Sequence, residues 1–110
     1  MTQASDRTID RMTLVAIAIV AYALANLIHE GLGHAGTCVV VGGRLTALSA
    51  VHAECAAESR SLLANSLITA AGTLANLLAG ATAWLLLSRQ EARLTSRRYF
   101  LWLLMTLNLL

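Results

Sequence analysis

The chain has 110 residues, of which 57% are hydrophobic and 13% charged, and its mean hydropathy is +0.67. Soluble domains usually carry about 25% charged residues, so this composition excludes an ordinary soluble domain. The net charge is +2, and the arginines are not spread over one continuous face, so no nucleic-acid partner is expected. We predict an all-α, polytopic helical membrane protein that forms one membrane domain (residues 1–110) in a lipid bilayer.

A polar head (residues 1–11) precedes the first apolar stretch, which runs over 12–41. About 20 apolar residues cross a bilayer as a helix, so a first transmembrane helix is expected here, ended by Gly42 and Gly43. A signal peptide is the alternative, because two arginines precede Ala-x-Ala sequences in this stretch. The apolar run continues past those sites and a second span follows, which favours a retained helix.

Three further pieces complete the chain. The connector (42–60) contains "RLTALSAVHAEC", whose partial alternation predicts a strand or short hairpin. Residues 61–88 are uncharged and long enough for a second transmembrane helix. After a basic turn (89–98), residues 99–110 are apolar, but as a helix they reach only roughly 18 Å. We therefore expect the start of a third helix and an N-terminal portion of a longer protein.

The arginines predict the orientation of the two spans. Six belong to the head and the basic turn, whereas the connector has two, Arg44 and Arg60. By the positive-inside rule the N-terminus is cytoplasmic and the connector faces outward. We expect an integral protein of a bacterial inner membrane.

The two cysteines, Cys38 and Cys55, lie at or beyond the outward end of the first helix. They can pair in an oxidising compartment. Unpaired small apolar residues and extra metal ligands are the alternatives.

The sequence His29-Glu30-Gly-Leu-Gly-His34 places three ionisable groups in an apolar stretch, where such groups are costly and usually functional. In the zinc motif H-E-x-x-H both histidines share a helix face and the glutamate acts as general base. Here the second histidine comes at i+5, which leaves the two side chains about 140° apart on a regular α-helix. A π-bulge would realign them, and Gly31 and Gly33 ease that distortion.

Two other arrangements stay open. Glu30 and His34, at i+4, can ligate a metal from an undistorted helix with His29 behind them. Alternatively, the histidines only form hydrogen bonds with their neighbours. We favour a metal site.

Both predicted spans carry a stripe of polar and small residues, the kind of surface that lets membrane helices approach closely. The stripe of the second span includes Asn76, which is expected to face the site. The members are Tyr22, Asn26, His29, Gly33 and Gly36 on the first span and Asn65, Thr69, Gly72, Asn76 and Gly80 on the second.

"HEGLGHAGTCVVVGG", followed about 40 residues later by "AAGTLANLLAG", resembles the intramembrane zinc metalloproteases of the site-2 protease group (peptidase family M50). The resemblance covers roughly residues 22–87. It implies that His29 and His34 are zinc ligands, that Glu30 is the general base, and that Asn76 holds substrate or the oxyanion. The implied reaction is hydrolysis of a peptide bond in a membrane-protein or peptide substrate, in or at the membrane.

The chain departs from that family at three points: the extra glycine between the histidines, Thr73 in place of a proline, and a missing ligand. The family takes its third ligand from an aspartate on a later helix, and no aspartate follows Asp10. A connector residue is the substitute within this chain, among His52, Glu54, Cys55 and Glu58. A non-catalytic relative and a metal-handling or transport protein are the alternative functions, and the sequence does not specify an oligomeric state.

Overall fold

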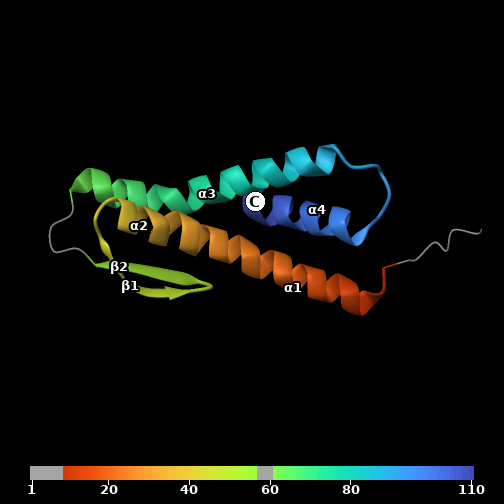
Figure 1. Cartoon of the computed structure of the whole chain (residues 1–110), viewed down its shortest axis with the longest axis horizontal. Helices are drawn as coiled ribbons and strands as arrows, with labels where there is room; N and C mark the ends of the chain where they lie inside the picture. Colours follow the sequence, from red (N-terminus) through yellow and green to blue (C-terminus); the bar gives the residue numbers. More distant parts are fainter. Residues whose placement is uncertain (1–8, 57–60) are drawn as a thin grey trace, which may run out of the picture.

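The computed structural model describes residues 9–56 and 61–110, and it is mostly helical with one small β-hairpin (Figure 1). The first long helix, Arg11–Val40, changes type along its length. Its parts are α1 (Arg11–Leu27), a π-helical segment η1 (Ile28–Ala35) and α2 (Gly36–Val40); the later elements are β1 (Arg44–Ser49), β2 (His52–Ala56), α3 (Leu62–Ser88) and α4 (Ser96–Leu109).

Side-chain caps set where the helices begin. The carboxylate of Asp10 accepts hydrogen bonds from the backbone and hydroxyl of Thr13 at 3.0 and 2.6 Å, which lowers the pKa of Asp10. Ser61 caps α3 in the same way. Thr95 accepts from the Arg98 N–H at 3.1 Å, so α4 begins at Ser96, earlier than the apolar pattern suggests. A hydroxyl cap starts a helix whatever the hydropathy of its first turn.

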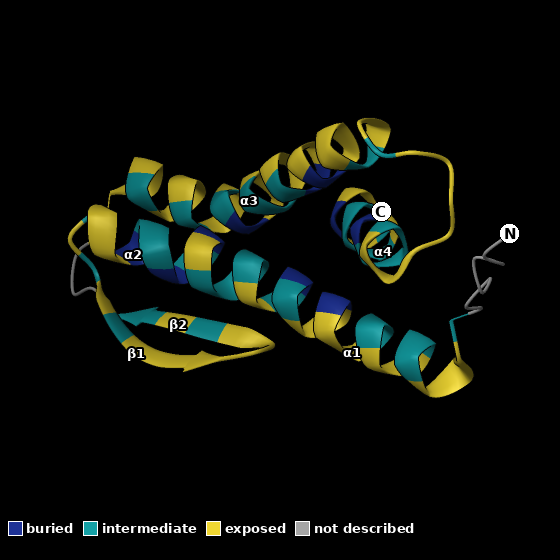
Figure 2. Ribbon diagram, turned by 45° about the vertical axis from the view of Figure 1, so that its right-hand side comes forward, coloured by how far each residue is buried: buried dark blue, intermediate teal, exposed yellow. Residues whose placement is uncertain are grey.

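Helices α1, α3 and α4 lie side by side, with α3 contacting both η1 and α4 (Figures 1 and 2). Two glycines meet where η1 contacts α3: a Cβ on Gly33 would lie 2.5 Å from the Cα of Gly72. Gly80 plays the same part against Leu109 of α4. The two small-residue stripes therefore meet at Gly33 and Gly72, whereas Gly80 of the second stripe faces α4 and Tyr22, Asn65 and Thr69 are exposed.

Burial is inverted relative to a water-soluble protein (Figure 2). Among the described residues, the buried apolar side chains are nearly all small, while many large ones point outward, such as Ile19 at 63% and Leu78 at 72% exposed. Arg11–Val40 and Leu62–Ser88 are long and apolar enough to cross a membrane, yet only 11% and 22% of their apolar stretches are buried. A core helix of a soluble protein would be mostly buried.

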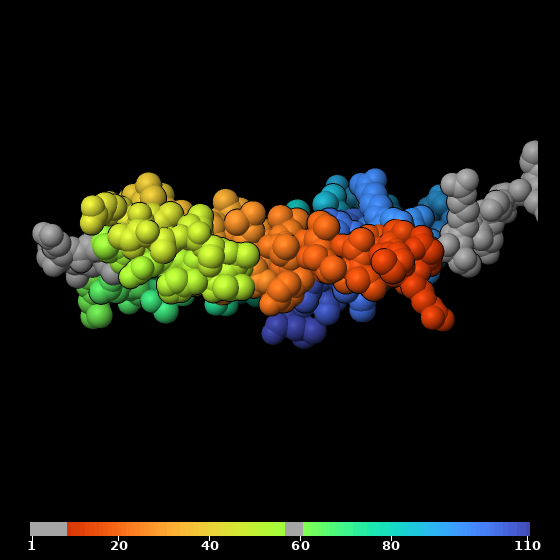
Figure 3. All heavy atoms as spheres, turned by 90° about the horizontal axis from the view of Figure 1, so that it is seen from below, coloured from red at the N-terminus to blue at the C-terminus, as the bar shows by residue number. Residues whose placement is uncertain are grey.

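The connector forms the predicted hairpin, with β1 antiparallel to β2 and Leu45 opposite Cys55. The chain turns at Gly42, whose φ of 80° suits glycine, and the hairpin then runs back along the first helix (Figure 3). A disulfide joins Cys38 to Cys55, with Cα atoms 5.9 Å apart. The cysteines therefore pair, and neither is left as a free residue or a metal ligand. Gly43 makes room for them, because a Cβ there would lie 2.6 Å from the Cys55 sulfur.

We expect the disulfide to stabilise the hairpin end of the molecule. It closes a sequence separation of 17 residues, and a loop of that size is worth about 3 kcal/mol in the chain-entropy account. The double variant Cys38→Ala/Cys55→Ala should lower the free energy of unfolding by about that amount in detergent micelles. Thiol titration of the unfolded, unreduced wild type should find no free thiol; two thiols would contradict the pairing.

Candidate metal centre

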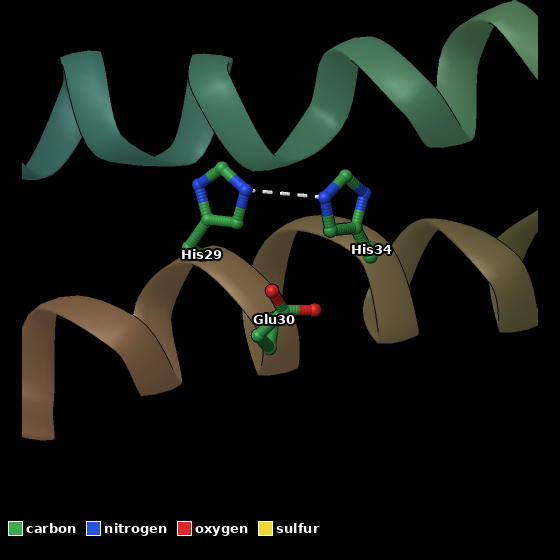
Figure 4. A group of neighbouring side chains, drawn as sticks. All are labelled: His29, Glu30 and His34. Carbon is green, nitrogen blue, oxygen red and sulfur yellow. Dashed lines mark hydrogen bonds between the residues drawn. The ribbon is translucent and has the colours of Figure 1, made fainter. Parts of the chain in front are cut away.

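Helix segment η1 brings His29, Glu30 and His34 together. Their ligand atoms all lie within 4.8 Å of one another, and each residue is half-buried. Both imidazoles point from η1 toward α3, while the Glu30 carboxylate lies between them, closer to its own helix (Figure 4). One nitrogen of each ring faces the other, with the two Nε2 atoms 3.2 Å apart.

The π-helical geometry is the reason that residues five apart can share a face. The Gly36 N–H donates to the carbonyl of Gly31, five residues earlier, and such i→i+5 turns occur frequently at functional sites. This confirms the π-bulge that the sequence spacing predicts. It sets aside the arrangement with Glu30 and His34 on a regular α-helix, because that helix is not regular here.

A backbone carbonyl fixes the orientation of His34. Its Nδ1 lies 2.6 Å from the Ile68 oxygen on α3. Because a carbonyl only accepts, Nδ1 of the neutral ring carries the proton and Nε2 keeps its lone pair. Metal-ligating histidines commonly have this arrangement, in which the second nitrogen donates to a carbonyl or carboxylate.

The separation of the two Nε2 atoms fits a shared ion. Nitrogen ligands of a tetrahedral zinc lie about 2.0–2.1 Å from it, which places two of them about 3.3 Å apart. The observed separation of 3.2 Å is close to that value. A direct N–H···N bond between the rings is the metal-free form of the same contact.

Gly72 provides the space in front of the two nitrogens. A Cβ at this position of α3 would lie 2.5 Å from Nε2 of His29 and 2.6 Å from Nε2 of His34. Any side chain at residue 72 would therefore press against both imidazoles. The sequence shows Gly72 only as a member of a small-residue stripe, and its role at the site depends on which residues of η1 face it.

The Glu30 carboxylate belongs to the same group, since its oxygen and a nitrogen of each histidine lie within 4.8 Å of one another. It is near enough to act as a further ligand of an ion at the histidines or to accept a hydrogen bond from a water molecule beside that ion.

Glu30 also separates two pockets. One, of about 430 Å³, lies between the hairpin, η1 and α3; its lining includes His34, His52, Asn65 and Thr69. The other, of about 270 Å³, faces α4 and is lined by Tyr22, Ala25, Asn26, His29, Glu30, Asn76 and Leu107. Asn76 thus lies near the cluster, as expected, and its buried Oδ1 lacks a hydrogen-bond partner among the described residues.

The four connector residues considered as a third ligand differ in position. Cys55 is in the disulfide, and Glu54 is exposed and does not line the pocket beside the cluster. His52 lines that pocket, although it is not in the group of converging ligand atoms. Glu58 lies outside the described residues.

Comparisons with protein-family models, curated proteins and solved structures found no significant match to this chain. The resemblance to site-2 proteases therefore rests on the two sequence motifs alone. The chemistry of the site has to be argued from its own atoms.

We predict that Gly72→Ala weakens metal binding at least about tenfold, the lower end of the effect of disturbing the surroundings of metal ligands. The added methyl group would displace both imidazoles. Gly80→Ala is the matched control. Gly80 is on the same helix as Gly72, and an added Cβ there would be just as crowded, at 2.6 Å from Leu109 of α4, but away from the cluster. Zinc affinity measured by competition with a chelating dye should separate the two variants; equal affinities would contradict this role for Gly72.

Proposed function

We propose that this chain is part of a membrane-embedded zinc hydrolase that cleaves peptide bonds in or beside the bilayer, like the site-2 proteases it resembles. The observation that carries the proposal is the pair of Nε2 atoms 3.2 Å apart in front of Gly72, with the Glu30 carboxylate beside them. Two imidazoles placed to share an ion, with a carboxylate beside them, supply two of the three protein ligands and the general base of a catalytic zinc site.

The membrane setting is supported by the two long apolar helices and by their outward-facing large side chains. In water so much exposed apolar surface would drive aggregation, whereas lipid covers it without cost. The disulfide end then faces an oxidising compartment, since disulfides persist there. The opposite end carries most of the arginines and faces the cytoplasm of a bacterial cell.

His29 and His34 would hold the zinc ion. A catalytic zinc lowers the pKa of a bound water toward about 7 and polarises a carbonyl. Glu30 accepts the water's proton and passes it to the leaving amine. Asn76 lines the pocket facing α4, and its Nδ2 would donate a hydrogen bond to the oxyanion that forms on the substrate carbonyl.

Water reaches Glu30 through the pocket under the hairpin. That pocket contains histidine, asparagine and threonine side chains, which can hold water in an otherwise apolar bundle. It opens beside the hairpin, on the half of the first helix that contains η1.

We predict about one zinc ion per chain in detergent-purified protein, measured by mass spectrometry of metal content. His34→Ala should lose the ion, because the site then retains one imidazole. Glu30→Gln should keep the ion and lose proteolysis of a membrane-peptide substrate. An absence of metal in the wild type would contradict the metal site, whereas metal without Glu30-dependent proteolysis would favour the metal-handling alternative.

We further predict that Asn76→Ala lowers kcat about 100-fold, the loss expected when one hydrogen bond to the reacting group is removed. Zinc content should be unchanged, because the candidate ligand atoms belong to His29, Glu30 and His34. Thr82→Ala, an exposed position on the same helix, is the control. An unchanged kcat would exclude Asn76 from the reaction.

A further inference from the structure

The end of the molecule opposite the disulfide gathers exposed arginines. The start of α1 and the loop from α3 to α4 lie at this end (Figures 1 and 3). Four of its arginines are exposed: Arg11, Arg89, Arg93 and Arg97. Arg98 is instead hydrogen-bonded within the loop, because its Nη1 donates to the carbonyls of Gln90 and Glu91 at 3.2 and 3.1 Å. It holds the loop in shape and leaves the other guanidinium groups directed at the surroundings.

The charge of this surface is positive. Across residues 9–11 and 88–98 there are five arginines and two acids, Asp10 and Glu91, which leaves a formal charge of +3. Asp10 is already hydrogen-bonded to Thr13 as a helix cap. Among the described residues, neither Asp10 nor Glu91 forms a side-chain hydrogen bond with an exposed guanidinium group at this end.

Aromatic side chains surround the same end. Four of the five aromatic residues of the chain lie within two turns of the α3–α4 loop: Trp84, Tyr99, Phe100 and Trp102. The rings of Tyr99 and Trp102 stack with centroids 6.3 Å apart, and both tryptophans are about half exposed. Tryptophan and tyrosine concentrate at the level of lipid headgroups, so this end has the composition of a membrane–water interface.

We propose that the arginine end binds the phosphate groups of anionic phospholipids at the membrane surface. The proposal rests on the membrane embedding of the proposed function, but not on its metal site. A net charge of +3 favours a headgroup that carries net negative charge over a zwitterionic one, whose cationic part is repelled. Each arginine near an anionic surface strengthens binding roughly fivefold, so three or four of them give a clear selection among lipids.

The chain contains its own probe, because both tryptophans lie at this end and none lies elsewhere. Brominated lipid tails quench tryptophan fluorescence on contact. The full chain is reconstituted in equimolar vesicles of phosphatidylglycerol and phosphatidylcholine, with bromine first on one lipid and then on the other. Bromine on phosphatidylglycerol should quench at least about twice as strongly.

In the triple variant Arg89→Gln/Arg93→Gln/Arg97→Gln, the tryptophan fluorescence should be quenched equally in both mixtures. Arg44→Gln is the control, because it removes an exposed arginine from the hairpin end and should keep the preference. Zinc content of the triple variant should remain that of the wild type, so failure of this proposal and failure of the metal site are read separately.

Two results would overturn the proposal: equal quenching in the two wild-type mixtures, or a preference that survives in the triple variant. A third arm separates lipid from free anion. If millimolar inorganic phosphate removes the preference at constant ionic strength, the surface binds a soluble phosphate and the lipid assignment is wrong. A preference that persists with phosphate present supports the lipid headgroup.

Discussion

The contact between Gly33 and Gly72 is the constraint on which the rest of the structure depends. In a lipid bilayer, large apolar side chains gain little by packing against each other, because the lipid tails are equally apolar. Membrane helices therefore pack through small residues that let their backbones approach closely. Here a Cβ on Gly33 would lie 2.5 Å from the Gly72 backbone, and the contact falls inside the π-helical segment. The imidazoles of His29 and His34, on either side of Gly33 in sequence, therefore lie against Gly72 of α3, which has no side chain to exclude them.

That arrangement also explains how polar groups are tolerated in an apolar helix. A buried imidazole or carboxylate is costly unless it is hydrogen-bonded. His34 is satisfied by the Ile68 carbonyl and by the ring of His29, while Glu30 borders two pockets that have polar linings. The widened turn of the π-helix frees backbone groups as well, and glycines on both sides of Leu32 lower the cost of the distortion. The same features that make the segment acceptable in the fold make it suitable for holding a cation.

Local features of the structure could be predicted from the sequence, and contacts through space could not. The π-helix follows from two histidines at i+5 with glycines between them, and the hairpin follows from the alternation after Gly43. Helix α4 begins at Ser96 and not at residue 99 as expected, because the expectation used only the apolar residues and did not consider the cap formed by Thr95. The pairing of Cys38 with Cys55 stayed open because pairing depends on how the hairpin folds back. The role of Gly72 was hidden for the same reason: a glycine in a small-residue stripe does not reveal which side chains lie opposite.

The chemical difference between the two ends gives the proposed orientation a second, independent support. Arginines and aromatic rings cluster at one end, while the other has a disulfide, and both features agree with the proposal that the disulfide end faces outward. The metal-binding segment is not central between them: His34 lies six residues before Val40 and 23 after Arg11, or about 9 Å and 35 Å along the helix axis. Glu30 therefore lies nearer the disulfide end, and the pocket that it lines under the hairpin is on that nearer side. In the proposed membrane orientation, the water that serves Glu30 would enter from the disulfide end through this pocket.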